Sequence, residues 1–205
     1  MRTSQACEDT IARIRAKGQW KKSLAATVRK ILQNTATPVP LYTEKRGYIA
    51  MSTRWMPKEE MHAFLAQHTE GRLATCSEAG EPYITPLNYL FHQGRLYFHS
   101  KREGRKLDNL SQNSRVCFEV SEVNKIVVAA DRPCACSTRY TSVLAFGSAR
   151  LIEDDLRKAA ILNLLMKRFA GEKPFPPVLE AQAARCAVIE MEIEQISGKR
   201  NVDPE

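Results

Sequence analysis

Alternation of apolar and polar residues predicts a series of strands from residue 72 onward. The clearest case is residues 188–196, where Ile189, Met191 and Ile193 alternate with glutamates, as in a half-buried antiparallel strand. Similar stretches are separated by turn sequences such as Glu78-Ala79-Gly80-Glu81 and His92-Gln93-Gly94. They predict further strands at residues 72–76, 83–91, 95–99, 116–120, 126–130 and 140–151.

Three other segments have the features of helices. Pro57 followed by acidic residues predicts a helix that runs to about residue 67, and Leu107 with Leu110 predicts a short helix at 104–112. Six or seven short strands with helices between them favour a mainly β fold with peripheral helices, of the α+β class, in which the sheet forms a barrel. A longer helix is predicted from residue 154 to about residue 169, with one apolar stripe: Ala160, Leu164, Leu165 and Phe169.

The first fifty residues differ from the rest in pattern and in charge. An interrupted helical period covers residues 5–33, and residues 35–48, with Pro38 and Pro40, are typical of a linker. We therefore predict a basic helical leader and linker over residues 1–50 and the main domain over residues 51–205. The leader is dispensable for the fold, packs on the body as a helix, or acts as a basic arm.

The formal net charge of +8 is unevenly distributed. Residues 1–50 hold ten Lys or Arg and three acidic residues, a net +7, whereas the remainder holds 21 basic and 20 acidic residues, a net +1. The basic character therefore belongs to the leader, and no nucleic-acid partner is expected for the core domain.

Composition also bears on the compartment. No apolar run approaches the roughly 18 residues of a membrane span, and no secretory signal is recognisable at the N-terminus, so we expect a cytoplasmic protein without a membrane partner. The six cysteines are mostly scattered, which suits a reducing compartment. Cys134 and Cys136 could chelate a metal, but no second ligand pair stands at a useful spacing, so we expect no metal site.

The strongest chemical feature is a predicted strand that ends Tyr97-Phe98-His99-Ser100 and is followed by a helix that begins at Gly104-Arg105-Lys106. The start of a helix offers unpaired backbone N–H groups and a partial positive charge, and two adjacent cationic side chains add to both. This arrangement predicts a phosphate site, although most basic pairs at helix starts are only solvated.

A resemblance to a known family strengthens this interpretation. Residues 71–150 resemble the pyridoxamine 5′-phosphate oxidase-like FMN-binding split barrels, particularly the branch that contains the nitroimidazole resistance proteins. The blocks that carry the resemblance occur in the expected order: Gly71-Arg72-Leu73-Ala74-Thr75, Pro82-Tyr83, Pro86-Leu87-Asn88-Tyr89, Tyr97-Phe98-His99-Ser100, Gly104-Arg105-Lys106-Leu107-Asp108-Asn109, Val116-Cys117-Phe118-Glu119-Val120, Arg139-Tyr140-Thr141-Ser142-Val143 and Phe146-Gly147. The tail at residues 193–200 also fits.

The resemblance implies a homodimer with FMN at its interface. The backbone of Thr85, Pro86, Leu87, Asn88 and Tyr89 would match the edge of the flavin ring, where proline removes one donor. It further implies that Arg105 and Lys106 hold the phosphate, and that His99, Ser100 and Ser142 contact the cofactor. Local alternatives are that Asn88 serves a turn or strand edge, that Ser142 bonds its own backbone, and that His99 is an exposed strand end.

Two classes of function follow from this resemblance. The first is an FMN-dependent oxidoreductase for a small aromatic or nitro-aromatic compound, with His99 as the candidate proton donor. Its reduced nicotinamide donor would dock transiently, because no Gly-x-Gly-x-x-Gly fingerprint is present. The second is a carrier or sensor that binds FMN or haem without turnover. A vitamin-B6 substrate is disfavoured because no histidine follows His99.

Overall fold

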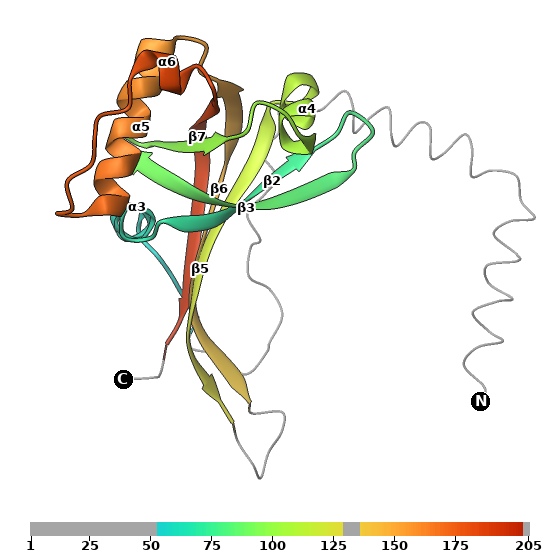
Figure 1. The fold of residues 1–205 in the computed structure, drawn as a ribbon. Coiled ribbons are helices and arrows are strands. Elements are labelled where there is room, and N and C mark those ends of the chain that lie inside the picture. Colours follow the sequence, from blue (N-terminus) through green and yellow to red (C-terminus); the bar gives the residue numbers. More distant parts are fainter. Residues whose placement is uncertain (1–52, 129–135, 203–205) are drawn as a thin grey trace, which may run out of the picture. The chain divides into compact units, whose positions relative to one another are not determined.

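The strands form one antiparallel sheet that closes on itself. The computed structural model describes residues 53–128 and 136–202, and within these ranges seven strands are ordered β1-β7-β4-β3-β2-β5-β6, with β6 also paired to β7 (Figure 1). The last six strands therefore make a closed ring, which confirms the predicted split-barrel class. Their bounds are β1 (Thr53–Trp55), β2 (Glu70–Cys76), β3 (Pro82–His92), β4 (Arg95–Ser100), β5 (Arg115–Val127), β6 (Ser137–Leu151) and β7 (Ala187–Asn201).

Strand β7 closes the barrel because it is long enough to have three partners. On one side its first half pairs with β4, from Ser100↔Ala187 to Arg95↔Glu192, and its end pairs with β1. On the other side it pairs with β6 over almost its whole length. One register shift, between Phe146 and Gly147, lets the two long strands stay paired while they bend.

Two features of the sheet differ from the sequence prediction. Strand β5 is continuous where two strands, at 116–120 and 126–130, were expected. A bulge between Val123 and Lys125 interrupts the alternation, while pairing with β6 continues on both sides of it. Residues 129 and 130 lie outside the described ranges. The short strand β1 was not predicted, because three residues carry too little periodicity.

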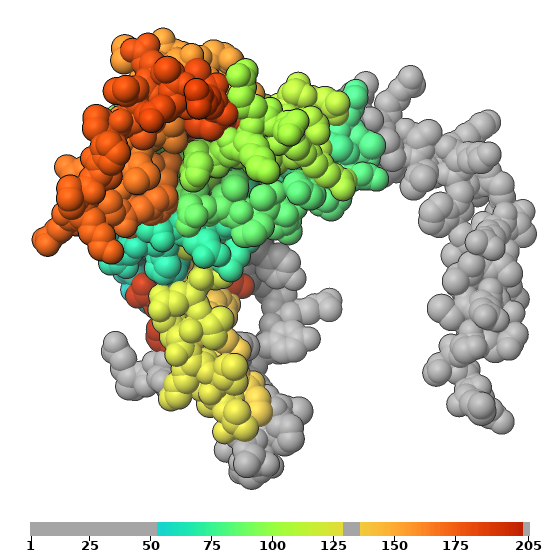
Figure 2. Space-filling model, in the orientation of Figure 1, coloured from blue at the N-terminus to red at the C-terminus, as the bar shows by residue number. Residues whose placement is uncertain are grey.

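Helices cover the outside of the barrel. The three predicted helices are present as α3 (Lys58–Gln67), α4 (Arg105–Gln112) and α5 (Asp155–Ala170), and a short helix α6 (Glu180–Ala183) was not expected. Helix α5 begins at Asp154, whose carboxylate accepts a hydrogen bond from the Arg157 amide. Figures 1 and 2 show α5 and α6 together on one flank of the barrel.

The predicted apolar stripe of α5 is largely wrong. Of its four members only Leu165 is buried, whereas Leu164 and Phe169 are exposed. The helix turns Ile161 and Leu165 toward the outer face of the barrel, where they join a cluster with Leu90, Tyr97 and Val188. The orientation of the helix is set by this cluster on the sheet, which the helical pattern alone does not identify.

The main core fills the interior of the barrel. Its fully buried residues include Leu73, Tyr89, Phe98 and Phe118, and α3 closes one end with Phe64 and Leu65. None of the helices in the described ranges is long and apolar enough to cross a membrane. The predicted leader and linker and Cys134 lie outside the described residues.

Candidate functional site

The split in the barrel lies between β3 and β4. Strand β3 pairs with β2 from Pro82 to Asn88 but with β4 only from Tyr89 to His92. Strand β4 pairs with β7 over its whole length, so His99 and Ser100 have β7 as a partner but not β3. Within the described part of the chain, the first seven residues of β3 therefore have one edge without a partner strand.

Backbone N–H and C=O groups alternate between the two edges of β3, and this alternation decides which of them face the open edge. The Tyr89 amide donates to the Thr69 carbonyl on the β2 side, at 3.0 Å. Since backbone groups alternate between the two edges of a strand, those of Thr85 and Leu87 also point toward β2. Those of Ile84, Pro86 and Asn88 point to the open edge, where the missing N–H of a proline breaks no ladder bond.

The side chains of the same residues divide between two faces. Tyr89 is fully buried, and its hydroxyl donates to the Leu65 carbonyl at 2.7 Å, so burial raises the pKa of this phenol. Pro86 and Asn88 are exposed. The hydroxyl oxygen of Thr85 is buried and has no hydrogen-bond partner among the described residues. Tyr89 thus acts as a core residue, and Thr85 presents a polar atom that a ligand could satisfy.

Helix α4 packs on β2 and β3, and its first residue, Arg105, contacts Glu81 and Tyr83 at the start of β3. Its N-cap is Gly104, whose φ of +123° excludes most other residues and which offers no capping side chain. Leu107 and Asp108 donate to the Gly104 carbonyl, whereas the amides of Arg105 and Lys106 precede the first intrahelical bonds. The helix start therefore presents free donors, as an anion site requires.

The two cations on the first turn have different surroundings. Arg105 is half-exposed, bonds to the Glu81 carboxylate at 2.8 Å and lies 5.1 Å above the ring of Tyr83. Lys106 is half-buried and forms no hydrogen bond or ion pair with a described residue. Burial lowers the pKa of Lys106, as expected for an ammonium group that is partly removed from water and has no carboxylate beside it among the described residues.

The remaining predicted residues are less closely grouped. His99 and Ser100 lie at the end of β4, where β4 separates from β3. His99 is exposed, and the Ser100 hydroxyl donates to the Lys101 carbonyl at 2.8 Å. Ser142 lies opposite Ser121. Cys117 of β5 is paired with Ala74 of β2, the strand on which α4 packs. Ser121 lies four residues farther along β5, about 13 Å from Cys117 at ~3.3 Å per residue. One chain therefore does not bring Ser142 to α4.

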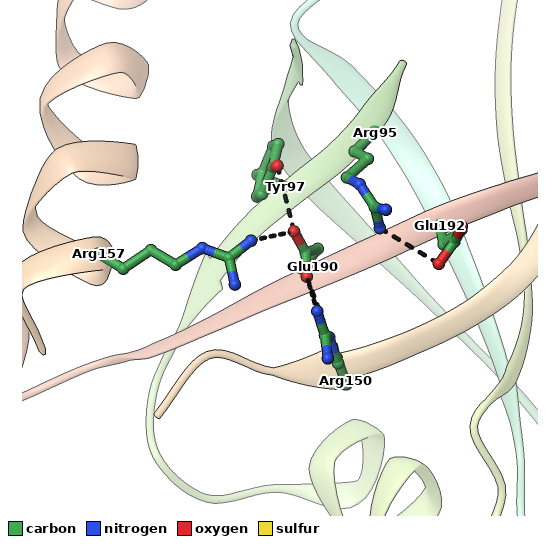
Figure 3. A network of polar contacts seen from close by, with 6 residues as sticks. All are labelled: Arg95, Tyr97, Arg150, Arg157, Glu190 and Glu192. Atoms are coloured by element: carbon green, nitrogen blue, oxygen red, sulfur yellow. Dashed lines mark hydrogen bonds and ion pairs between the residues drawn. The ribbon is translucent and has the colours of Figure 1, made fainter. Parts of the chain in front are cut away.

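A separate polar cluster surrounds Glu190, which is 1% exposed (Figure 3). Its carboxylate accepts hydrogen bonds from Arg150 at 2.9 Å, from Tyr97 at 3.2 Å and from Arg157 on α5. Burial by itself raises the pKa of Glu190, but these partners outweigh it and the pKa is lowered. Both oxygens are occupied by protein groups, so the cluster ties α5 to the barrel.

Sequence reasoning missed the residues that hold α4 in place, namely Tyr83, Glu81, Thr75 and Asn109. Thr75 and Asn109 are 3% and 4% exposed and bonded to each other. A buried Asn three residues after a surface Lys carries no local signal, because its burial depends on how the helix is turned.

Comparison with known proteins identifies the fold independently. A family model described as pyridoxamine 5′-phosphate oxidase matches residues 57–200. No curated protein matches the sequence.

Three solved structures illustrate the similarity. A candidate 5-nitroimidazole antibiotic resistance protein from Bacteroides thetaiotaomicron is 25% identical, with 78% of this chain and 94% of that chain covered and a TM-score of 0.63. An FAD-binding protein from Mesorhizobium loti is 25% identical, with coverages of 74% and 100% and a TM-score of 0.56. A flavocytochrome from Azotobacter vinelandii is 26% identical, with coverages of 75% and 71% and a TM-score of 0.65.

The matched residues contain the closed ring of strands except Asn201 at the end of β7, and they include the split between β3 and β4 and helix α4. The sequence resemblance predicted the same family from residues 71–150. This chain belongs to the pyridoxamine 5′-phosphate oxidase family of split-barrel proteins.

Proposed function

We propose that this protein is an FMN-dependent oxidoreductase that acts on a small aromatic or nitro-aromatic compound, with FMN bound between the open edge of β3 and the start of α4. The observation that carries the proposal is Lys106, a half-buried cation on the first turn of α4 that has no partner within residues 53–128 and 136–202. Over the same residues, the neighbouring strand β3 has one edge without a partner strand. Similarity to proteins named as FAD-binding and as a flavocytochrome supports a flavin.

The residues present fit such a cofactor. Lys106 and the free amides at the start of α4 would hold the phosphate. The amides of Ile84 and Asn88, with the carbonyls along the same edge, match the polar edge of a flavin ring in kind. The buried Thr85 hydroxyl would gain a partner. The bound flavin supplies electron or hydride transfer, and His99 is the candidate side chain for proton delivery.

We also propose a homodimer whose two sites share residues. Ile84 on the open edge is 63% exposed, and Ile126, near the end of β5, is 70% exposed. Val123 and Val128, close to Ile126 in the sequence, are also exposed, at 64% and 74%, and a group of exposed apolar side chains of this kind favours an interface. Since Ser142 lies far from α4 in its own chain, it would contact the flavin held by the partner subunit.

The first test is the absorption spectrum of the purified protein, followed by anaerobic reduction with a reduced nicotinamide. We expect a flavin spectrum that bleaches and that a nitro-aromatic compound restores faster than oxygen does. A flavin that only oxygen reoxidises would favour a carrier or sensor, the alternative function. A Soret band in place of a flavin band would contradict the flavin assignment, since haem has its own axial-ligand chemistry.

The second test measures the affinities for FMN and riboflavin in variants of Arg105 and Lys106. Arg105→Ala with Lys106→Ala should weaken FMN binding by roughly 2 kcal/mol or more and leave riboflavin binding nearly unchanged, because only FMN has the phosphate. Lys106→Ala alone should account for most of the loss, since Arg105 already has a carboxylate partner. Lys167→Ala, an exposed cation on α5, is the control. Unchanged FMN affinity in the folded double variant would refute the site.

A further inference from the structure

A buried polar pair joins α4 to the sheet beneath it. Asn109 on α4 donates from Nδ2 to the hydroxyl of Thr75 on β2 at 2.9 Å. The same hydroxyl donates to the Tyr83 carbonyl on β3 at 3.4 Å, a long and weaker bond. Asn109 and Thr75 are 4% and 3% exposed, so water does not compete for this contact.

Burial of apolar surface does not require an asparagine at this position. The neighbouring inward residues of α4 are Leu107, which is buried, and Leu110, which packs against the core. A leucine at 109 would bury more apolar area, whereas an amide costs free energy on burial unless it is hydrogen-bonded. The Asn109 amide instead orients the helix, because a directional hydrogen bond fixes the rotation of this eight-residue helix about its axis more narrowly than apolar contact does.

That rotation sets the position of Lys106. Residues three apart lie on the same face of a helix, so Lys106 and Asn109 share one face of α4. The face that Asn109 anchors to Thr75 is therefore the face from which Lys106 extends, which accounts for a lysine that is half-buried rather than solvated.

A second contact closes the arrangement. Thr75 lies opposite Tyr83 in the β2–β3 ladder, and the guanidinium of Arg105 covers the Tyr83 ring. Helix α4 thus meets the same hairpin at its first turn and at Asn109. The exposed Arg105–Glu81 pair contributes little stability by itself, so the buried bond is the stronger restraint.

We infer that Asn109 and Thr75 are positioning residues for the phosphate end of the proposed flavin site, acting by fixing the rotation of α4 relative to the open edge of β3. This inference rests on the proposed function. Both residues would affect phosphate binding indirectly, through the position of α4, and neither would contact the ligand.

The test uses the ratio of riboflavin to FMN dissociation constants in the full chain, which isolates the contribution of the phosphate. Asn109→Leu and Thr75→Val, singly and together, should lower this ratio about tenfold, the loss expected when a charge-assisted contact is misplaced. Riboflavin affinity should change little. The double variant removes both polar partners and should remain folded, since no buried group is left unsatisfied. Thr75→Ser keeps the hydroxyl and should keep the wild-type ratio.

Asn163→Leu is the matched control. Asn163 on α5 bonds to the amide and carbonyl of Val178, so its loss should destabilise the fold without changing the ratio. A folded double variant with the wild-type ratio would overturn the inference and leave the proposed function intact. A wild-type protein that binds FMN no better than riboflavin, with no effect of Lys106→Ala, would instead overturn the phosphate site and the inference together.

Discussion

At the scale of the residue, surroundings separate side chains that look equivalent in the sequence. Arg105 and Lys106 are adjacent cations on one helical turn, yet Arg105 is neutralised by Glu81 and Lys106 is not. Both would count equally in a charge pattern. The difference in burial and pairing makes Lys106 the better candidate for anion binding.

Glu190 illustrates the same principle and gives a pH-dependent prediction. Its pKa in the folded protein lies below the ordinary value of 4.5. Its ion pairs therefore stabilise the fold fully above that pH, and the stabilisation is lost as the pH falls through the folded-state pKa. We expect Glu190→Gln to lower the free energy of unfolding by about 1–3 kcal/mol at pH 7, with a smaller difference from wild type at pH values below 4.5.

Urea unfolding at several pH values measures this difference. Glu192→Gln is the control, because Glu192 is exposed and pairs with Arg95 on the surface at 3.3 Å (Figure 3). Its effect should stay within about 0.5 kcal/mol. Equal effects of the two substitutions would mean that burial does not strengthen the Glu190 cluster.

At the scale of the element, a glycine allows the two long strands β6 and β7 to pair where their register shifts. Gly147 of β6 lies at the register shift opposite β7, and a Cβ placed on it would lie 1.8 Å from the Glu192 carbonyl oxygen. The backbone of β7 would have to move to relieve this contact, and that movement would cost free energy. The glycine is therefore required for the two strands to pair across the bulge.

We expect Gly147→Ala to destabilise the protein by roughly 2–3 kcal/mol through overpacking against the backbone. Denaturant unfolding monitored by circular dichroism checks this value. Thr138→Ala, at an exposed position on the same strand, should change stability by less than about 0.5 kcal/mol. Wild-type stability of the Gly147 variant would show that the bulge can relax.

At the scale of the whole molecule, the closed ring of strands and helix α3 together enclose the main core. Its core cluster runs from Met56 to Met191. We expect a chain that starts at Met51 to fold and to bind FMN as the full chain does, measured by circular dichroism and flavin titration. A chain that starts at Glu70 should fail to fold, because it loses Met61, Phe64 and Leu65 from the core. Failure of the longer chain would show that residues 1–50 complete the fold.

Local features were predictable to the extent that they depend on neighbours in the sequence. The hairpin of β3 and β4 and helices α3 and α4 follow from turn residues and periodicity, and the structure confirms them. Strand β7 is also present, but its predicted alternation fails at Glu190, which is buried because α5 covers this part of the outer face. The buried face of α5 and the continuity of β5 did not follow, because each depends on a partner surface distant in the sequence. The domain boundary at Met51 and the roles of His99 and Ser142 stay predictions.

The sequence by itself determined most of the strands, the turns and the family, since these are properties of short segments and of their order, and it supplied the residues on which the proposed phosphate site rests. Only the tertiary structure decided that, among the described residues, no strand pairs with the edge of β3 at Ile84, Pro86 and Asn88 and no side chain pairs with Lys106, whereas Arg105 pairs with Glu81. The physical reason is that free edges, burial and ion pairing depend on long-range closure of the sheet by β7 and on the rotation of α4 against it.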